Sequence, residues 1–219
     1  MPRVLFEKKG NAVWISHLDL MRLFQRAFKR AGLLLKHSQG YNPRPYVAVA
    51  LPLSVGVESV CELLDFDLDG DPVSCDVIRE RLNDALVDGI KVLDVYEEGA
   101  KIKHLALLDC TVTLEYDQGV PNGAVPALEG LFAQPTLPVQ KKSKNGPVEQ
   151  DIIPMIRSLK IHQMDDHCVQ LRAMVCCQNP SLNPMQLVAA IQKYLPEYAP
   201  DHAASCRLGL YDANEKPFR

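Results

Sequence analysis

The sequence predicts an α+β protein made of two tandem ferredoxin-like domains, each with the element order βαββαβ and an antiparallel sheet. The chain has 219 residues, a length that suits one or two domains of about 100 residues. Hydrophobic residues make up 47% of it and charged residues 23%, which is enough apolar material for packed cores. Strand-like and helix-like patterns also follow one another in the same order in both halves, without a sequence repeat.

The first half predicts the order strand, helix, strand, strand, helix, strand. Residues 3–16 alternate apolar and polar side chains, with a Gly-Asn turn, and predict a strand. Residues 16–32 predict an amphipathic helix, in which Ser16 caps the start with Asp19 in a capping-box position and Gly32 ends it. Further elements are strands at 46–59 and 60–70, a helix at 74–86 and a strand at 90–98.

The helix at 16–32 has two distinct faces. One face is apolar and should pack on the sheet; it consists of Leu20, Leu23, Phe24, Ala27, Phe28 and Ala31. The other is basic and consists of Arg22, Arg26, Lys29 and Arg30, at spacings of three, four and seven to eight residues. The basic residues are therefore predicted to form a ridge.

The second half repeats the pattern approximately. It predicts a strand at 105–116, a helix at 124–134, a hairpin-like segment at 136–153, a strand at 168–177, a helix at 183–195 and a strand at 204–212. We expect the boundary near residues 99–104, with domains at 1–100 and 104–219. A single larger α+β domain with a joint sheet is the alternative.

Cysteine usage and hydropathy exclude several classes of protein. The cysteines are odd in number, scattered and mostly within apolar runs, at Cys61, Cys75, Cys110, Cys168, Cys176, Cys177 and Cys206. They indicate reduced core thiols rather than a disulfide framework, and with no C-x-x-C pair we expect no metal and no cofactor. No apolar run of about 18 residues occurs, and the first ten residues lack the apolar segment of a secretory signal. We expect a cytoplasmic protein without membrane contact.

Charge is segregated along the chain. The net charge is −3, yet residues 20–57 hold no Asp or Glu. Their basic residues are Arg22, Arg26, Lys29, Arg30, Lys36 and Arg44. A solvated surface normally intersperses the two signs, so this stretch predicts an anion site and could lie along the phosphates of a nucleic acid. A plain solvated helix face and the docking of an acidic protein are the alternatives.

The loop at 38–45, SQGYNPRP, is stiffened by its prolines. Gly40 can take a positive φ, so the loop can present Tyr41, Asn42 and Arg44 at fixed positions. An exposed tyrosine beside an arginine could stack on an unpaired RNA base. His37 lies on the same loop and could contact the ligand. The alternative is a packed structural loop with Tyr41 at the core edge.

The residues Ser16, His17 and Asp19 are the types found in hydrolase triads. Their positions around a helix start are better explained by capping and by the helix dipole. We therefore interpret His17 and Asp19 as a possible structural or ligand-contacting site and assign no catalytic residue.

The hairpin-like segment at 136–153 has lysines before an Asn-Gly turn signal, namely Lys141, Lys142 and Lys144. Such lysines usually mark a soluble loop. The functional interpretation makes them a second arm of the anion site, so that RNA would lie between the two halves.

Four motifs carry a resemblance to a known family: S-H-L-D at 16–19, S-x-G-[FY]-N-P-x-P at 38–45, L-P-x-x-V-G at 51–56 and K-K-x-K at 141–144. With the basic helix between them, they resemble the radical-SAM-linked bacterial domain of unknown function. Its members are fused behind a radical SAM domain or occur as separate short proteins. This chain lacks the C-x-x-x-C-x-x-C that holds the cluster of such enzymes, so it resembles the stand-alone form without radical chemistry of its own. In element order it is also similar to tandem ferredoxin-like endoribonucleases that cleave CRISPR repeats.

We therefore expect an RNA-binding accessory protein that works with a separately encoded radical SAM protein, in the modification or processing of tRNA or rRNA. The basic ridge is well defined, whereas no nucleophile, base or cofactor signature stands out. The alternatives are a metal-independent endoribonuclease and an adaptor that docks on a radical SAM partner.

Overall fold

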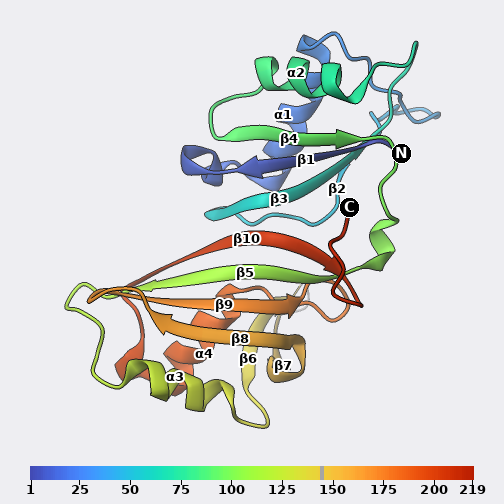
Figure 1. The fold of residues 1–219 in the computed structure, drawn as a ribbon. Helices are drawn as coiled ribbons and strands as arrows, with labels where there is room; N and C mark the ends of the chain where they lie inside the picture. The colour runs from blue at the N-terminus through green and yellow to red at the C-terminus, as the bar shows by residue number, and fades with distance from the viewer. Residues whose placement is uncertain (144–145) are drawn as a thin grey trace. The chain divides into compact units, whose positions relative to one another are not determined.

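The computed structural model of the protein describes residues 1–143 and 146–219, with the side chains of residues 142–143 also left undescribed. It is an α+β protein, and the strands within each of its sheets pair antiparallel. The chain divides into two compact units (Figure 1): an N-terminal unit of residues 1–102 with Arg219, and a C-terminal unit of residues 103–218.

The N-terminal unit has the order strand, helix, strand, strand, helix, strand. Its elements are β1 (Arg3–Lys8), the 3₁₀ helix η1 (Gly10–Trp14), α1 (His17–Arg30), β2 (Val47–Val49), β3 (Val57–Phe66), α2 (Cys75–Ala85) and β4 (Ile90–Tyr96). Its strands lie in the order β4-β1-β3-β2. Both helices lie on one face of this sheet (Figure 1).

The core of the N-terminal unit lies between the sheet and its two helices. The predicted apolar face of α1 is turned inward, with Phe24 and Phe28 fully buried. The ring of Phe24 meets that of Phe6 edge to face, with 4.7 Å between centroids, and Phe28 lies 5.0 Å from Phe66. Aromatic pairs in such arrangements stabilise a core beyond the area that they bury. The opposite face of α1 is left to solvent.

The C-terminal unit follows a similar plan with one insertion. Its elements are β5 (Leu105–Glu115), α3 (Ala124–Phe132), β6 (Pro138–Ser143), β7 (Gly146–Asp151), the 3₁₀ helix η3 (Ile153–Met155), β8 (Ile156–Gln163), β9 (Cys168–Cys176), α4 (Met185–Tyr194), the 3₁₀ helix η4 (Pro196–Tyr198) and β10 (His202–Asp212), after a 3₁₀ turn η2 (Ile102–His104). Its sheet has the order β10-β5-β9-β8, and β6 and β7 form a separate hairpin. With the β6–β7 hairpin left aside, the two units share one strand order. The first strand (β1 or β5) lies between the last (β4 or β10) and the third (β3 or β9), and the second (β2 or β8) pairs with the third at the edge.

Two strands predicted from the sequence are wrong in extent, and one observed strand was not predicted. The strand predicted at 3–16 ends at Lys8, because the chain turns through η1 at Gly10–Trp14. Of the strand predicted at 46–59, residues 50–56 are irregular, since Pro52 and Gly56 interrupt it, and only Val47–Val49 and the start of β3 pair. β8 was not predicted, because most of its side chains are exposed and its apolar signal is weak.

Other predictions are confirmed. The hairpin expected at 136–153 is present as β6 and β7, and α1, α2, α3 and α4 begin and end within two residues of their predicted ranges. None of the helices in the described ranges is both long and apolar enough to cross a membrane.

Candidate nucleic-acid interface

The start of α1 is fixed by the predicted cap. The backbone N–H of Asp19 donates to the Ser16 hydroxyl over 3.2 Å, and that hydroxyl donates to an Asp19 carboxylate oxygen over 2.7 Å. The Arg22 guanidinium donates to the other carboxylate oxygen of Asp19 over 2.9 Å. The hydrogen bond from Ser16, and after it the one from Arg22, lower the pKa of the Asp19 carboxyl below its usual value. The Ser16 and Asp19 side chains therefore serve the helix end, as the capping interpretation predicts.

A buried lysine holds the turn that leads into α1. Lys8 is fully buried at the end of β1, and its Nζ donates to the carbonyl oxygens of Val13, over 3.1 Å, and Ile15, over 2.8 Å. Bonds from an ammonium group are stronger than those between neutral groups. The segment between η1 and α1 is thereby tied to the sheet on both sides of Trp14.

The basic ridge lies on the exposed face of α1. Arg22, Arg26 and Lys29 are all exposed. Arg22 forms an ion pair of 2.9 Å with Asp19, one turn earlier on the same helix, and both groups are open to solvent, where such pairs contribute little. Within the described residues, Arg26 and Lys29 form no ion pair and no side-chain hydrogen bond. These two cations remain available to a ligand.

Two other predicted cations are engaged within the N-terminal unit. Arg30 donates from its guanidinium to the carbonyl oxygen of Ala85 at the end of α2, where the helix dipole favours a positive charge. Lys36 lies 3.4 Å from a carboxylate oxygen of Asp67. The positive charge of residues 20–57 is thus balanced in part by Asp67, which is distant in sequence. The hydrogen bond of Arg30 links α1 to the end of α2.

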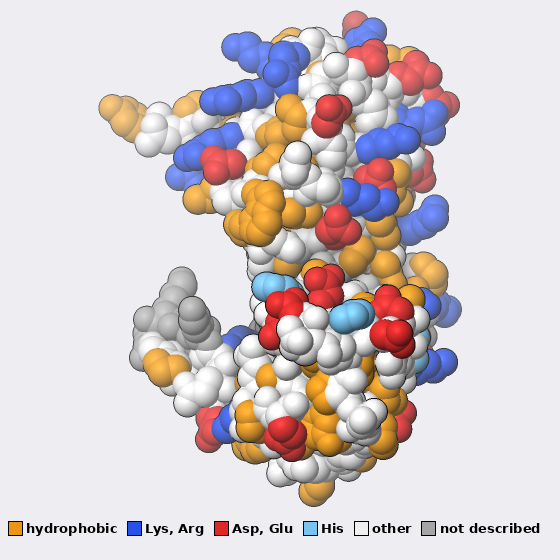
Figure 2. All heavy atoms as spheres, turned by 90° about the vertical axis from the view of Figure 1, so that its left-hand side faces the viewer, with side chains coloured by type: hydrophobic (Ala, Val, Ile, Leu, Met, Phe, Trp, Pro, Cys, Tyr) orange, Lys and Arg blue, Asp and Glu red, His pale blue; other side chains and the backbone are white. Residues whose placement is uncertain are grey.

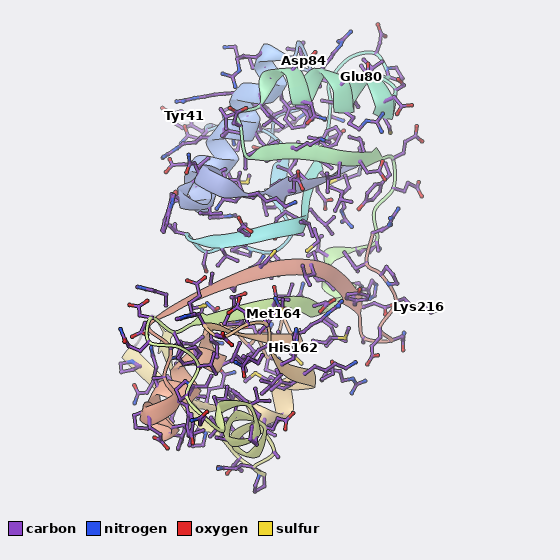
Figure 3. The ribbon with its side chains drawn as sticks, turned by 60° about the vertical axis from the view of Figure 1, so that its left-hand side comes forward. Tyr41, Glu80, Asp84, His162, Met164 and Lys216 are labelled. Atoms are coloured by element: carbon purple, nitrogen blue, oxygen red, sulfur yellow. The ribbon has the colours of Figure 1, made fainter. Side chains whose placement is uncertain are left out.

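The loop after α1 projects from the unit as a short hairpin. The Ser38 N–H donates to the Arg44 carbonyl over 2.8 Å, and the Tyr46 N–H donates to the Lys36 carbonyl over 2.8 Å. At its tip Tyr41 is completely exposed and lies at the outer side of the unit (Figure 3). Gly40 takes the expected positive φ, 139°. Tyr41 therefore does not fill the core edge.

The remaining side chains of this loop are also exposed. Asn42 and Arg44 face solvent, and no hydrogen bond or ion pair involves either side chain among the described residues. The backbone N–H of Arg44 donates to the Ser38 hydroxyl over 3.0 Å, which shapes the loop. His37 is exposed, and its Nδ1 lies 2.9 Å from the Leu35 carbonyl oxygen. The loop thus presents Tyr41 and Arg44 on a hydrogen-bonded frame.

His17 does not complete a triad. It lies in the first turn of α1, and its Nδ1 is buried without a hydrogen-bond partner in the described part of the chain. The Ser16 hydroxyl is directed to Asp19 instead. A nucleophile activated by a histidine needs a hydrogen bond between the two, so this geometry supplies no base to Ser16.

The lysines of the β6–β7 hairpin are only partly described. Lys141 donates from Nζ to the carbonyl oxygen of Ser181, over 3.1 Å, and to its hydroxyl, over 3.2 Å, so it serves the packing of its own unit. Lys144 and the side chain of Lys142 lie outside the described residues. Within 1–143 and 146–219, His, Cys, Asp and Glu form no cluster of three or more that could hold a metal ion.

One exposed aromatic residue near the basic helix was not predicted from the sequence as part of the site. Trp14 is 70% exposed at the end of η1, just before the basic helix, where a strand was predicted. Leu18, 66% exposed, follows in the first turn of α1. Figure 2 shows Lys and Arg side chains gathered at the upper left of the N-terminal unit, with exposed hydrophobic side chains beside them. The one feature of the sequence that singles out Trp14 is that it is the only tryptophan of the chain.

Comparison with known proteins gives a family and a fold. The family described as "Uncharacterized protein conserved in bacteria (DUF2344)" matches residues 2–184. No curated protein matches. A chain of a solved structure, titled "Crystal Structure of a Cbf5-Nop10-Gar1 Complex", aligns with a TM-score of 0.54 at 9% identity, covering 94% of this chain and 47% of that one. This chain thus spans about half the length of that chain, and the likeness is one of fold.

A second solved structure, of an unknown protein from Galdieria sulphuraria, is 11% identical and covers 94% of this chain and 96% of that one. Its TM-score of 0.27 is too low to compare the folds.

Proposed function

Since the chain belongs to the DUF2344 family of uncharacterized proteins conserved in bacteria, we propose from its own surface that it is an RNA-binding accessory protein. The RNA contacts α1 and the loop of residues 36–46, and the phosphates contact the cations there. The resemblance of its motifs adds a radical SAM protein as the partner to which RNA is presented, in the modification or processing of tRNA or rRNA. Both units are assigned to the ferredoxin-like fold on the strength of their common strand order.

The observation that carries this proposal is the pair Arg26 and Lys29, exposed on α1 without an ion pair among the described residues. Four residues advance an α-helix by about 6 Å, so Arg22 and Arg26 are spaced at about two nucleotides of a stacked strand. Cations that neutralise phosphates release counterions, and that release drives non-specific binding to nucleic acids.

The loop adds a second kind of contact. Tyr41 and Arg44 are exposed on a frame that hydrogen bonds hold. Aromatic rings and guanidinium planes are the groups on which proteins stack unpaired RNA bases. The cations can contact phosphates, and the tyrosine ring can stack on a base. This combination favours RNA over an acidic protein as the ligand.

Charge reversal tests the proposal. Arg26→Glu combined with Lys29→Glu should abolish binding to fluorescently labelled bulk RNA, measured by anisotropy at low salt. The matched control reverses Lys91 and Lys101, which are exposed in the same unit without an ion pair among the described residues. It imposes the same net charge change and should bind nearly as the parent does. Equal affinity of the parent and the Arg26/Lys29 variant would overturn the proposal.

A pulldown from nuclease-treated lysate tests the competing adaptor function. A partner protein that is retained without RNA, and lost from the Arg26/Lys29 variant, would assign α1 to protein docking and overturn RNA binding. If the parent retains no such partner but enriches RNA from untreated lysate, the RNA proposal is supported.

A further inference from the structure

Trp14 is exposed to a degree unusual for its type. Tryptophan is highly buried on average in folded proteins, and its ring carries the largest apolar area of any side chain. Here 70% of the residue is open to solvent. Exposed apolar side chains mark a contact surface where several of them lie together, so the neighbours of Trp14 decide its role.

The segment that carries Trp14 is fixed from two sides. The buried Lys8 amine donates to the carbonyl oxygens of both neighbours of Trp14 in the chain, Val13 and Ile15. The Gly56 N–H donates to the same Val13 oxygen over 2.9 Å. The backbone at Trp14 is therefore preorganised, and little ordering remains to be done on binding.

The ring of Trp14 lies beside a glycine. Its Cζ3 atom is 3.7 Å from the place that a Cβ of Gly56 would take, and Gly56 has φ +81°, which favours glycine. Val55, the preceding residue, is 51% exposed. The ring of Trp14 and the exposed side chain of Val55 thus both lie at the turn of Gly56.

Basic residues follow Trp14 in the sequence, along α1. Leu18, 66% exposed, lies in the first turn of the helix, and Arg22 lies one turn further on, about 6 Å along the axis. Arg26 follows after the same step. The order along the exposed side is therefore an aromatic ring, an aliphatic side chain and then cations, which is the arrangement of a single-strand site with a stacking platform and a charged track.

We propose that Trp14 is a stacking platform for an unpaired base, so that the RNA bound along α1 is single-stranded at this point. This inference rests on the proposed RNA binding and names its substrate class. In a duplex the base faces are stacked on one another, and only their edges are open in the grooves. A duplex could still contact the cations of α1 but could not cover the ring of Trp14.

The single tryptophan makes the test direct, because its fluorescence reports on Trp14 alone. The parent is titrated with oligoadenylate RNA of about 12 nucleotides, within the range of about 4–16 for single-strand sites. The same strand annealed to its oligouridylate complement is the comparison. We expect quenching of tryptophan fluorescence that saturates with the bound fraction for the single strand, and no quenching for the duplex.

Variants separate stacking from charge. Trp14→Ala should weaken binding of the labelled single strand about 5- to 150-fold, the range for losing one base stack, while Trp14→Phe should retain most of the affinity. The salt dependence should not change in Trp14→Ala, since no phosphate contact is lost. Met164→Ala, which truncates a 54% exposed apolar side chain of the C-terminal unit (Figure 3), is the control and should bind as the parent does.

The failure of this inference and that of the proposed function are distinguishable. Salt-dependent RNA binding with unchanged affinity in Trp14→Ala and no quenching would overturn the stacking platform and leave RNA binding standing. Equal quenching by the duplex would also overturn it. Absence of binding to both the single strand and the duplex would overturn the proposed function and the inference together.

Discussion

The salt dependence of RNA binding can be worked out from the cations on the surface. Arg30 is excluded because it donates to the Ala85 carbonyl at the end of α2. The ion pairs of Arg22 with Asp19 and of Lys36 with Asp67 are exposed to solvent, where such pairs contribute little, so phosphates can replace those carboxylates. Five side chains on α1 and its loop can then contact phosphates: Arg22, Arg26, Lys29, Lys36 and Arg44. With one phosphate each, log K should fall against log salt with a slope of about −3.5 for a single strand. Replacing two of them by alanine should change the slope to about −2.1.

These slopes translate into measurable affinities. Between about 50 and about 200 mM KCl the parent should lose about 130-fold in affinity, and Arg26→Ala with Lys29→Ala only about 20-fold. Dissociation constants are measured by fluorescence anisotropy of a labelled single-stranded RNA at four or more KCl concentrations and constant pH.

The control for this experiment removes the same net charge elsewhere in the unit. Lys91→Ala with Lys101→Ala should leave the slope at its parent value, because neither lysine lies on α1 or its loop. A double variant on α1 with the parent's slope would refute the assignment of Arg26 and Lys29 to phosphates. A parent slope near zero would refute the electrostatic reasoning altogether.

The core, the helix cap and the thiols supply three more predictions. Phe24→Ala should lower the free energy of unfolding by about 3–5 kcal/mol in urea denaturation, because the side chain is fully buried. Hydrogen bonding, first from Ser16, lowers the pKa of the Asp19 carboxyl below 3.8. The ionised carboxylate therefore stabilises the fold above about pH 4, and this stabilisation is lost as the pH falls through the lowered pKa. In Asp19→Asn, the free energy of unfolding measured in urea should accordingly fall less between neutral and acid pH than it does in the parent. Burial raises the pKa of Cys110 and Cys177 to about 12, so at about pH 8 neither should react with Ellman's reagent until the protein unfolds, and labelling of either in the folded state would contradict this.

The helices could be predicted because their signals are local. In α1 the apolar residues recur with the helical period, and Ser16 supplies the cap. The strands were harder. β8 is an edge strand whose side chains are mostly exposed, so it lacks the alternation that marks a half-buried strand. The segment at 46–59 has that alternation but pairs over only three residues before Pro52.

The residues of the candidate site and their exposure could be predicted from the sequence, whereas the contacts among them could not. Its cations and Tyr41 are exposed, as the functional interpretation requires. That Arg30 reaches the Ala85 carbonyl, and Lys36 the Asp67 carboxylate, follows only from packing, since both partners are distant in sequence. Trp14 was missed because the turn that exposes it depends on bonds from the buried Lys8 amine.

The two helices of the N-terminal unit cover the same sheet face, yet their exposed sides differ in charge. On α2 the signs are interspersed, with Arg79 and Asp76 paired over 3.0 Å and with Glu80 and Asp84 directed outward (Figure 3). On α1 four cations follow one another with a single carboxylate at the start. Like charges one turn apart destabilise a helix by about 0.2–0.5 kcal/mol per pair, so folding alone does not favour this arrangement.

This difference gives a prediction that separates stability from function. Arg26 has Arg22 and Arg30 as neighbours one turn away on either side, so Arg26→Glu replaces two repulsions by two attractions. The free energy of unfolding in urea, followed by circular dichroism, should be unchanged or higher by about 1 kcal/mol, whereas affinity for RNA should fall. A variant that binds poorly because it is destabilised would show that Arg26 serves the fold and is not held in reserve for a ligand.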